Sequence, residues 1–106
     1  CWVGDVAEGL VRATEKAAEG IILAKPVEVG PEVNHTVQEI AQMIIDLTGS
    51  SSRLVNLPMR PGEKANSIVK ADINTMLQVD MTPADLMPLE QGMQETVDWF
   101  KKTYFS

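Results

Sequence analysis

The stretch Thr36–Gly49, TVQEIAQMIIDLTG, contains the clearest folding signal in the sequence. Its first four residues form a capping box, in which the Thr36 hydroxyl accepts from the Glu39 amide and the Glu39 side chain accepts from the Thr36 amide. Gly49 is a typical helix terminator. The apolar residues between these signals share one helical face: Val37, Ile40, Ala41, Ile44 and Ile45. The stretch therefore predicts an amphipathic helix.

Helical periodicity also marks the two ends of the chain. Residues 5–18 predict a helix that ends near Gly20, with one apolar face: Val6, Leu10, Ala13 and Ala17. Residues 89–104 predict another, with its own apolar face: Leu89, Met93, Val97, Phe100 and Tyr104. Between these ends, Asp72 is expected to cap a short helix through Leu77. Thr82-Pro83 marks a further start, with proline at the first helical position.

Two segments rich in β-branched residues predict short strands, Val27–Val29 and Leu54–Leu57. Residues 58–70 have no helical period and predict a loop. We therefore expect an α+β fold, a small and mostly helical single domain over residues 1–106 with three to five helices and two short strands. Two strands do not form an independently stable sheet, so they are expected to pack on helices or to extend a sheet supplied by something else.

Length and charge exclude several classes of protein. The 106 residues fit one small domain, and the net charge of −6 disfavours nucleic-acid and anionic-membrane partners. The single cysteine, Cys1, excludes an internal disulfide. The longest apolar run, Ile21–Ala24, is far shorter than the roughly 20 residues of a membrane span. We expect a cytoplasmic protein. Because the first residue is not methionine, we also expect sequence upstream or a removed tag.

Several motifs that carry chemistry are absent from the sequence. The seven glycines never form G-x-G-x-x-G or a Walker loop, so no dinucleotide-binding site is expected in this chain. His35 is the only histidine and Cys1 the only thiol, which argues against a zinc site and against a Cys/His nucleophile pair. We therefore predict no catalytic, cofactor-binding or metal-binding residue.

One segment has the residue types of an anion site, Arg60-Pro61-Gly62-Glu63. An arginine beside Pro-Gly is held on a turn, where its planar guanidinium can bind a phosphate through two parallel hydrogen bonds. Glu63 can accept hydrogen bonds from sugar hydroxyls. Taken alone, the same four residues also fit a solvent-exposed turn with a surface ion pair.

Five segments occur in an order and spacing that resemble a known family: WVGDVA (2–7), VEVG followed by TVQEIA (27–30 and 36–41), PMRPGE (58–63), ADI (71–73), and LEQGM followed by TVDWF (89–93 and 96–100). Together they resemble the carboxy-terminal third of the extended short-chain dehydrogenases/reductases. This family includes UDP-galactose epimerases, UDP-glucuronate decarboxylases and related NAD-dependent nucleotide-sugar enzymes. The resemblance covers nearly the whole chain.

The resemblance implies a substrate-binding domain for a UDP- or dTDP-sugar. It implies that Arg60 contacts the substrate diphosphate and that Glu63, or its backbone, lies near the nucleotide ribose. NAD would be held by an amino-terminal Rossmann half that this chain lacks, and the family's catalytic Tyr-x-x-x-Lys is also missing. The only tyrosine, Tyr104, belongs to the last helix. The segment Met76–Pro83 departs from the family's usual Leu-Gly-Trp-x-Pro connection.

Two other hypotheses stay open at the level of sequence. The chain can be a free-standing binding module derived from such a domain. It would then expose the surface that normally faces the Rossmann half, including Val3 and Val6, and self-associate as a homo-oligomer or bind a partner. Alternatively, the chain is a helical protein that resembles the family by coincidence.

Overall fold

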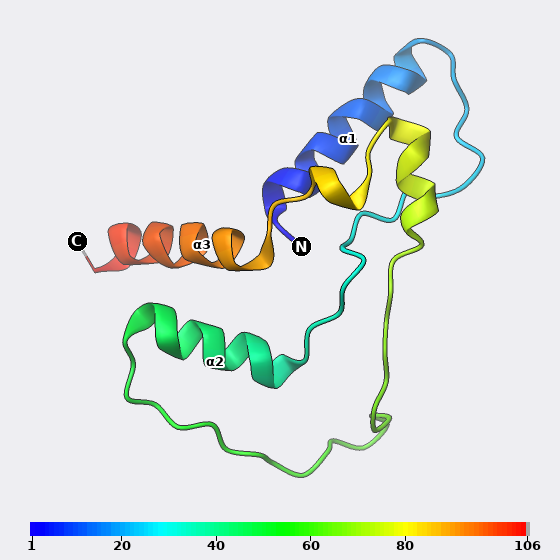
Figure 1. The fold of residues 1–106 in the computed structure, drawn as a ribbon. Coiled ribbons are helices and arrows are strands. Elements are labelled where there is room, and N and C mark those ends of the chain that lie inside the picture. The colour runs from blue at the N-terminus through cyan, green and yellow to red at the C-terminus, as the bar shows by residue number, and fades with distance from the viewer. Residues whose placement is uncertain (106) are drawn as a thin grey trace. The chain divides into compact units, whose positions relative to one another are not determined.

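A computed structural model describes residues 1–105 and shows three α-helices and two short 3₁₀ helices in that range. The α-helices are α1 (Val3–Ala18), α2 (Val37–Thr48) and α3 (Leu89–Tyr104), and the 3₁₀ helices are η1 (Ile73–Val79) and η2 (Pro83–Asp85) (Figure 1). The chain divides into two compact units. The first unit comprises Cys1–Asn34 and Lys70–Met93. The second comprises His35–Val69 and the chain from Gln94 onward.

The core of the first unit lies where α1 packs against η1. Met76, Val79 and Met81 are its fully buried side chains. The partly buried residues packed around them come from α1, the segment after it, and the residue that follows η2: Ala13, Leu23, Val27 and Leu86. Asp72 caps η1 by accepting from the Asn74 amide at 3.2 Å, as the sequence predicts.

Two glycines let backbone segments approach closely in the first unit. A Cβ on Gly9 of α1 would lie 3.1 Å from Cγ2 of Val29, and a Cβ on Gly30 would lie 2.7 Å from the Cβ of Ala71. Neither distance leaves room for a side chain without movement of its neighbour. The two glycines therefore set how closely residues 29–30 pack on α1 and on the chain before η1.

Polar bonds complete the link between α1 and η1. The Arg12 guanidinium donates to the carbonyls of Val79 at 3.4 Å and Asp80 at 2.9 Å, and Lys16 pairs with Asp80 at 3.2 Å. The carboxylate of Glu8 bonds the same guanidinium and raises the pKa of Arg12. Asp80 follows η1 with a φ of 57°, so η1 ends in a left-handed residue whose carbonyl faces Arg12.

In the second unit, α2 has both predicted ends. The Glu39 amide donates to Oγ1 of Thr36 at 3.1 Å, and the Thr36 amide donates to the Glu39 carboxylate at 3.4 Å. Gly49 ends the helix in the left-handed conformation at φ 64°. Lys101 of α3 donates to the carbonyl of Leu47 at 3.5 Å. The capping box and the terminator are thus confirmed.

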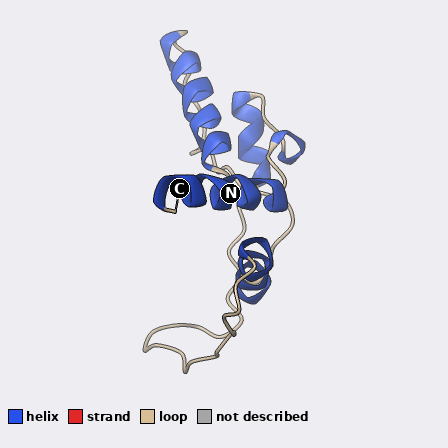
Figure 2. Cartoon of the chain, turned by 90° about the vertical axis from the view of Figure 1, so that its left-hand side faces the viewer, coloured by secondary structure: helices blue, strands red, loops and turns tan. Residues whose placement is uncertain are grey.

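The predicted α+β fold is wrong about the two strands, because residues 1–105 contain only helices and loops (Figure 2). The mostly helical content is confirmed. Around the first predicted strand, backbone groups bond to side chains of η1. The Glu28 amide donates to Thr75 Oγ1 at 2.8 Å, and the Lys25 amide donates to Gln78 Oε1 at 3.1 Å. The second predicted strand, Leu54–Leu57, is exposed throughout and pairs with no other segment, and an unpaired strand is not stable in water.

Candidate functional site

The Arg60–Glu63 segment folds into a self-contained turn. The Glu63 amide donates to the Arg60 carbonyl at 3.1 Å, which closes four residues into one β-turn. Gly62 has a φ of 88°, the value that the third residue of a type II turn requires, and proline suits the second position. The backbone preferences of the Pro-Gly pair therefore favour this turn.

The Glu63 carboxylate also holds the Arg60 side chain and backbone. One oxygen, Oε2, accepts from the Arg60 amide at 2.9 Å. The other, Oε1, accepts from Nε at 2.8 Å and lies 2.7 Å from Nη2. The two residues that the sequence singles out are therefore brought together, as partners of each other.

The Arg60 guanidinium keeps most of its hydrogen-bonding capacity. Its side chain is 86% exposed, whereas that of Glu63 is 39% exposed. Of the five guanidinium N–H donors, the pair with Glu63 occupies the edge formed by Nε and Nη2. The edge formed by Nη1 and Nη2 faces away from this contact, with the fork geometry that suits a phosphate or carboxylate.

The loop around this turn differs in charge from the rest of the chain. Residues 50–69 are all exposed and carry Arg53, Arg60 and Lys64 against one acidic residue, Glu63, a net charge of +2. Because the whole chain carries −6, the remainder carries −8. The loop is the local place where an anion is attracted to an otherwise acidic protein.

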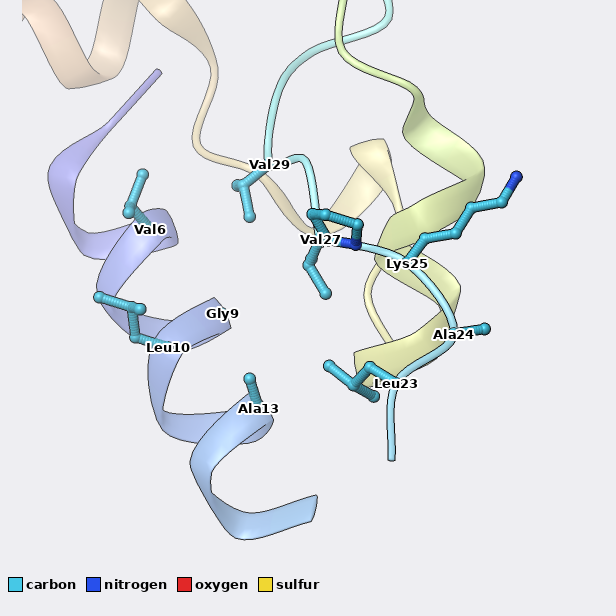
Figure 3. Close-up of a pocket in the computed structure, with 10 residues that line it drawn as sticks. Val6, Gly9, Leu10, Ala13, Leu23, Ala24, Lys25, Val27 and Val29 are labelled. Carbon is cyan, nitrogen blue, oxygen red and sulfur yellow. The ribbon is translucent and has the colours of Figure 1, made fainter. Parts of the chain in front are cut away.

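A separate, apolar groove of about 470 Å³ lies in the first unit (Figure 3). It runs between α1 and the segment that follows it, with Val6, Leu10 and Ala13 on one side and Leu23, Val27 and Val29 on the other. Val6 is 40% exposed and Leu10 is 65% exposed. The apolar face predicted for α1 is therefore real, but only its Ala13 end packs on the core.

A second, polar hollow of about 350 Å³ lies beside Arg12 and Lys16. Its basic groups are already bonded to Glu8 and to the end of η1. The acidic lining residues Glu15 and Glu19 leave the hollow with more negative than positive groups. We interpret it as the surface of the α1–η1 contact rather than as a binding site.

Asp5, His35 and Tyr104 contact neighbouring parts of the protein. Asp5 accepts from the Met87 amide at 2.9 Å and so ties the start of α1 to the chain before α3. His35 Nδ1 lies 3.3 Å from the Glu39 carboxylate in an exposed position. Tyr104 is exposed and contacts Trp99 and Phe100.

The described residues contain neither a metal-binding cluster nor a membrane-spanning helix. No group of three or more His, Cys, Asp and Glu side chains in residues 1–105 is placed to hold a metal ion. Over the same range, every helix is too short or too polar to cross a bilayer.

Similarity to curated proteins is found over nearly the full chain. A UDP-N-acetyl-alpha-D-glucosaminuronate decarboxylase from Bacillus cytotoxicus is 29% identical over 105 residues, which cover 95% of this chain and 31% of that protein. UDP-glucuronic acid decarboxylase 1 from Danio rerio is 30% identical over 104 residues, covering 95% of this chain and 22% of that protein. This chain therefore spans less than a third of the length of these relatives.

Both relatives are nucleotide-sugar decarboxylases by name, the class of enzyme that the sequence motifs resemble. To that extent the resemblance is confirmed. No protein-family model matches the chain, and no solved structure matches it significantly.

The residues of this chain do not fit an NAD site. A dinucleotide cradle needs a strand, a glycine-rich turn and a helix in succession. The sequence has no such glycine spacing, and residues 1–105 contain no strand to precede it. No step of chemistry through NAD is therefore assigned to the groups in this chain.

Proposed function

We propose that this chain is a substrate-side portion of an NAD-dependent nucleotide-sugar enzyme, and that its Arg60-Pro61-Gly62-Glu63 turn binds the nucleotide diphosphate. The supporting observation is the geometry of the turn. Glu63 bonds the Nε and Nη2 edge of the Arg60 guanidinium, here called the inner edge, and leaves the Nη1 and Nη2 edge, the outer edge, open. The turn lies in the only loop of the described chain with an excess of basic residues. The relatives named as UDP-sugar decarboxylases support a UDP-sugar as the ligand.

In this proposal the chain binds and orients its ligand without performing the reaction. A diphosphate offers pairs of oxygens that match the fork of a guanidinium. NAD and the catalytic tyrosine and lysine would belong to a Rossmann half outside this chain. Binding by this chain alone is expected to be weak, because a single charged hydrogen-bonding group contributes only about 1.5–3 kcal/mol.

The proposal predicts a diphosphate-dependent response centred on Arg60. In a nuclear magnetic resonance titration of the full chain, UDP should shift the backbone amides of Gly62 and Glu63 and the Nε–H of Arg60. Uridine, which lacks phosphate, should not. The Arg60→Ala variant should bind UDP about tenfold more weakly, which corresponds to roughly 1.4 kcal/mol.

Arg53→Ala is the matched control, because it removes an exposed arginine from the same loop without touching the turn. Its UDP affinity should stay within about twofold of the original. If Arg53→Ala and Arg60→Ala weaken UDP affinity equally, the effect comes from the overall charge of the loop and not from the turn. An unchanged affinity in Arg60→Ala would refute the proposed site.

A second candidate function is a free-standing interaction module that self-associates. The observation in its favour is the exposed apolar face of α1, where Val3, Val6 and Leu10 are between 40% and 72% exposed. A contiguous exposed apolar face is one of the features that mark a surface for binding another protein.

Light scattering of the full chain over a concentration series separates the two functions. Self-association predicts a mass that rises with concentration and falls back in a Leu10→Gln variant. A mass that stays at 11.6 kDa throughout leaves the self-associating module without support.

A further inference from the structure

We propose that Glu63 is a positioning residue for Arg60, and that it does not itself contact the ribose. Its carboxylate fixes the inner edge of the guanidinium and so presents the outer edge to a phosphate. The inference rests on the proposed function, because it assigns Glu63 a role in the same anion site.

Three contacts from one carboxylate define this role. Oε2 holds the Arg60 backbone amide at 2.9 Å, while Oε1 lies 2.8 Å from Nε and 2.7 Å from Nη2. The backbone bond from Glu63 to the Arg60 carbonyl closes the same ring of residues. Both ends of the arginine are therefore tied to Glu63, and both carboxylate oxygens are already in use.

The guanidinium donors that Glu63 leaves open indicate that Glu63 positions Arg60 for a phosphate and does not block phosphate binding. A carboxylate that competed with phosphate would occupy the outer edge of the guanidinium, formed by Nη1 and Nη2. Here it occupies the inner edge, and no bond from Nη1 is found among the described residues. An arginine held in one orientation also loses less side-chain freedom when a ligand binds.

Two opposing effects of Glu63 on affinity can be compared. Its negative charge repels an anion at the outer edge by about threefold in water at low salt, and by less at physiological ionic strength. Holding a long side chain in one orientation raises affinity by up to about tenfold. The net expectation is that Glu63 strengthens phosphate binding.

The first part of the test needs no ligand and reads the Nε–H resonance of Arg60. In the unmodified chain this proton should exchange more slowly with water than that of the exposed Arg53, because it is bonded to Glu63. In Glu63→Gln the charge is lost while the backbone of the turn is kept, so the Gly62 amide should move little. The Arg60 Nε–H should then exchange at least about threefold faster, because a neutral acceptor bonds a guanidinium more weakly.

The second part measures UDP affinity by titration of the same variants. Glu63→Gln and Glu63→Ala should bind UDP about three- to tenfold more weakly than the original chain. Glu95→Gln removes an equal charge from the second unit and should leave both the Arg60 resonance and the affinity unchanged.

The outcomes separate this inference from the proposed function. If Arg60→Ala binds UDP as well as the original, the anion site and the role of Glu63 in it both fail. If Arg60→Ala binds weakly but Glu63→Gln binds UDP equally or more tightly, only the positioning role is overturned. An unchanged Arg60 Nε–H exchange rate in Glu63→Gln overturns it without reference to any ligand.

Discussion

The side chain of Gln78 makes the hydrogen bonds that a neighbouring strand would otherwise make to the backbone of Lys25. Its amide oxygen accepts from the Lys25 backbone amide at 3.1 Å, and its amide nitrogen donates to the carbonyls of Lys25 at 3.1 Å and Thr75 at 3.0 Å. One side chain thus satisfies both backbone groups of Lys25. Because these backbone groups are already hydrogen-bonded, the extended segment does not require a neighbouring strand to satisfy them.

We predict that Gln78→Ala destabilises the first unit by about 1 kcal/mol, because it removes two exposed bonds to the Lys25 backbone and one partly buried bond to the Thr75 carbonyl. Urea unfolding followed by circular dichroism measures the change. Gln94→Ala is the control, since Gln94 makes a single exposed bond to Asp98 within α3 and its loss should cost less than about 0.5 kcal/mol. Equal losses in the two variants would contradict the role assigned to Gln78.

Sequence reasoning found Arg60 and Glu63 but not Gln78 or Thr75, and the difference has a physical cause. The Pro-Gly pair dictates a turn from four adjacent residues, so the ion pair within it is a local property. Gln78 and Thr75 bond to partners 53 and 47 residues away. No spacing rule in a single sequence connects positions so far apart. That Arg60 binds a ligand stays a prediction.

At the scale of elements, helices with local end signals were predicted well. The capping box, the left-handed Gly49 and the apolar periodicity of α2 all act within one or two turns, and each is present. The two strands were predicted wrongly because a strand depends on a partner. Residues 54–57 have the right composition, but the described chain offers them no edge to pair with.

The cap of α2 provides a test at this scale. We predict that Thr36→Ala costs about 1 kcal/mol of helix stability, because it leaves the Glu39 amide without its side-chain acceptor. Helical circular dichroism during thermal unfolding measures the effect. Thr48→Ala is a suitable control, since the Thr48 hydroxyl only bonds back to carbonyls of its own helix. A larger loss from Thr48→Ala than from Thr36→Ala would show that the capping box does not limit the stability of α2.

At the scale of the whole molecule, the two units differ in how much apolar surface they bury. The first unit buries the apolar side chains of Met76, Val79 and Met81. In the described part of the second unit, Val97 is the buried apolar side chain. No residue of α2 is fully buried. Stability depends on the apolar area removed from water, so the second unit is expected to open more readily.

Native-state hydrogen exchange tests this difference directly. We predict that amides of η1 and the adjacent half of α1 exchange at least about tenfold more slowly than those of α2, because a difference of about 1.4 kcal/mol in opening free energy gives that ratio. Exchange of α2 as slow as that of η1 would show that something covers its exposed face in solution. Comparing the rates at two protein concentrations would then identify self-association.

The positions of the two tryptophans have a practical consequence for optical experiments. Trp2 belongs to the first unit, where its ring lies against the backbone of Gly92, and Trp99 belongs to the second, where it is 58% exposed and meets Tyr104 edge to face. Each unit therefore contains its own intrinsic fluorophore. In a Trp2→Phe chain all tryptophan emission reports the second unit, and in a Trp99→Phe chain it reports the first. Energy transfer from Tyr104, whose ring centre is 6.0 Å from that of Trp99, should weaken when the end of α3 loses its helical structure, because the two rings then move apart.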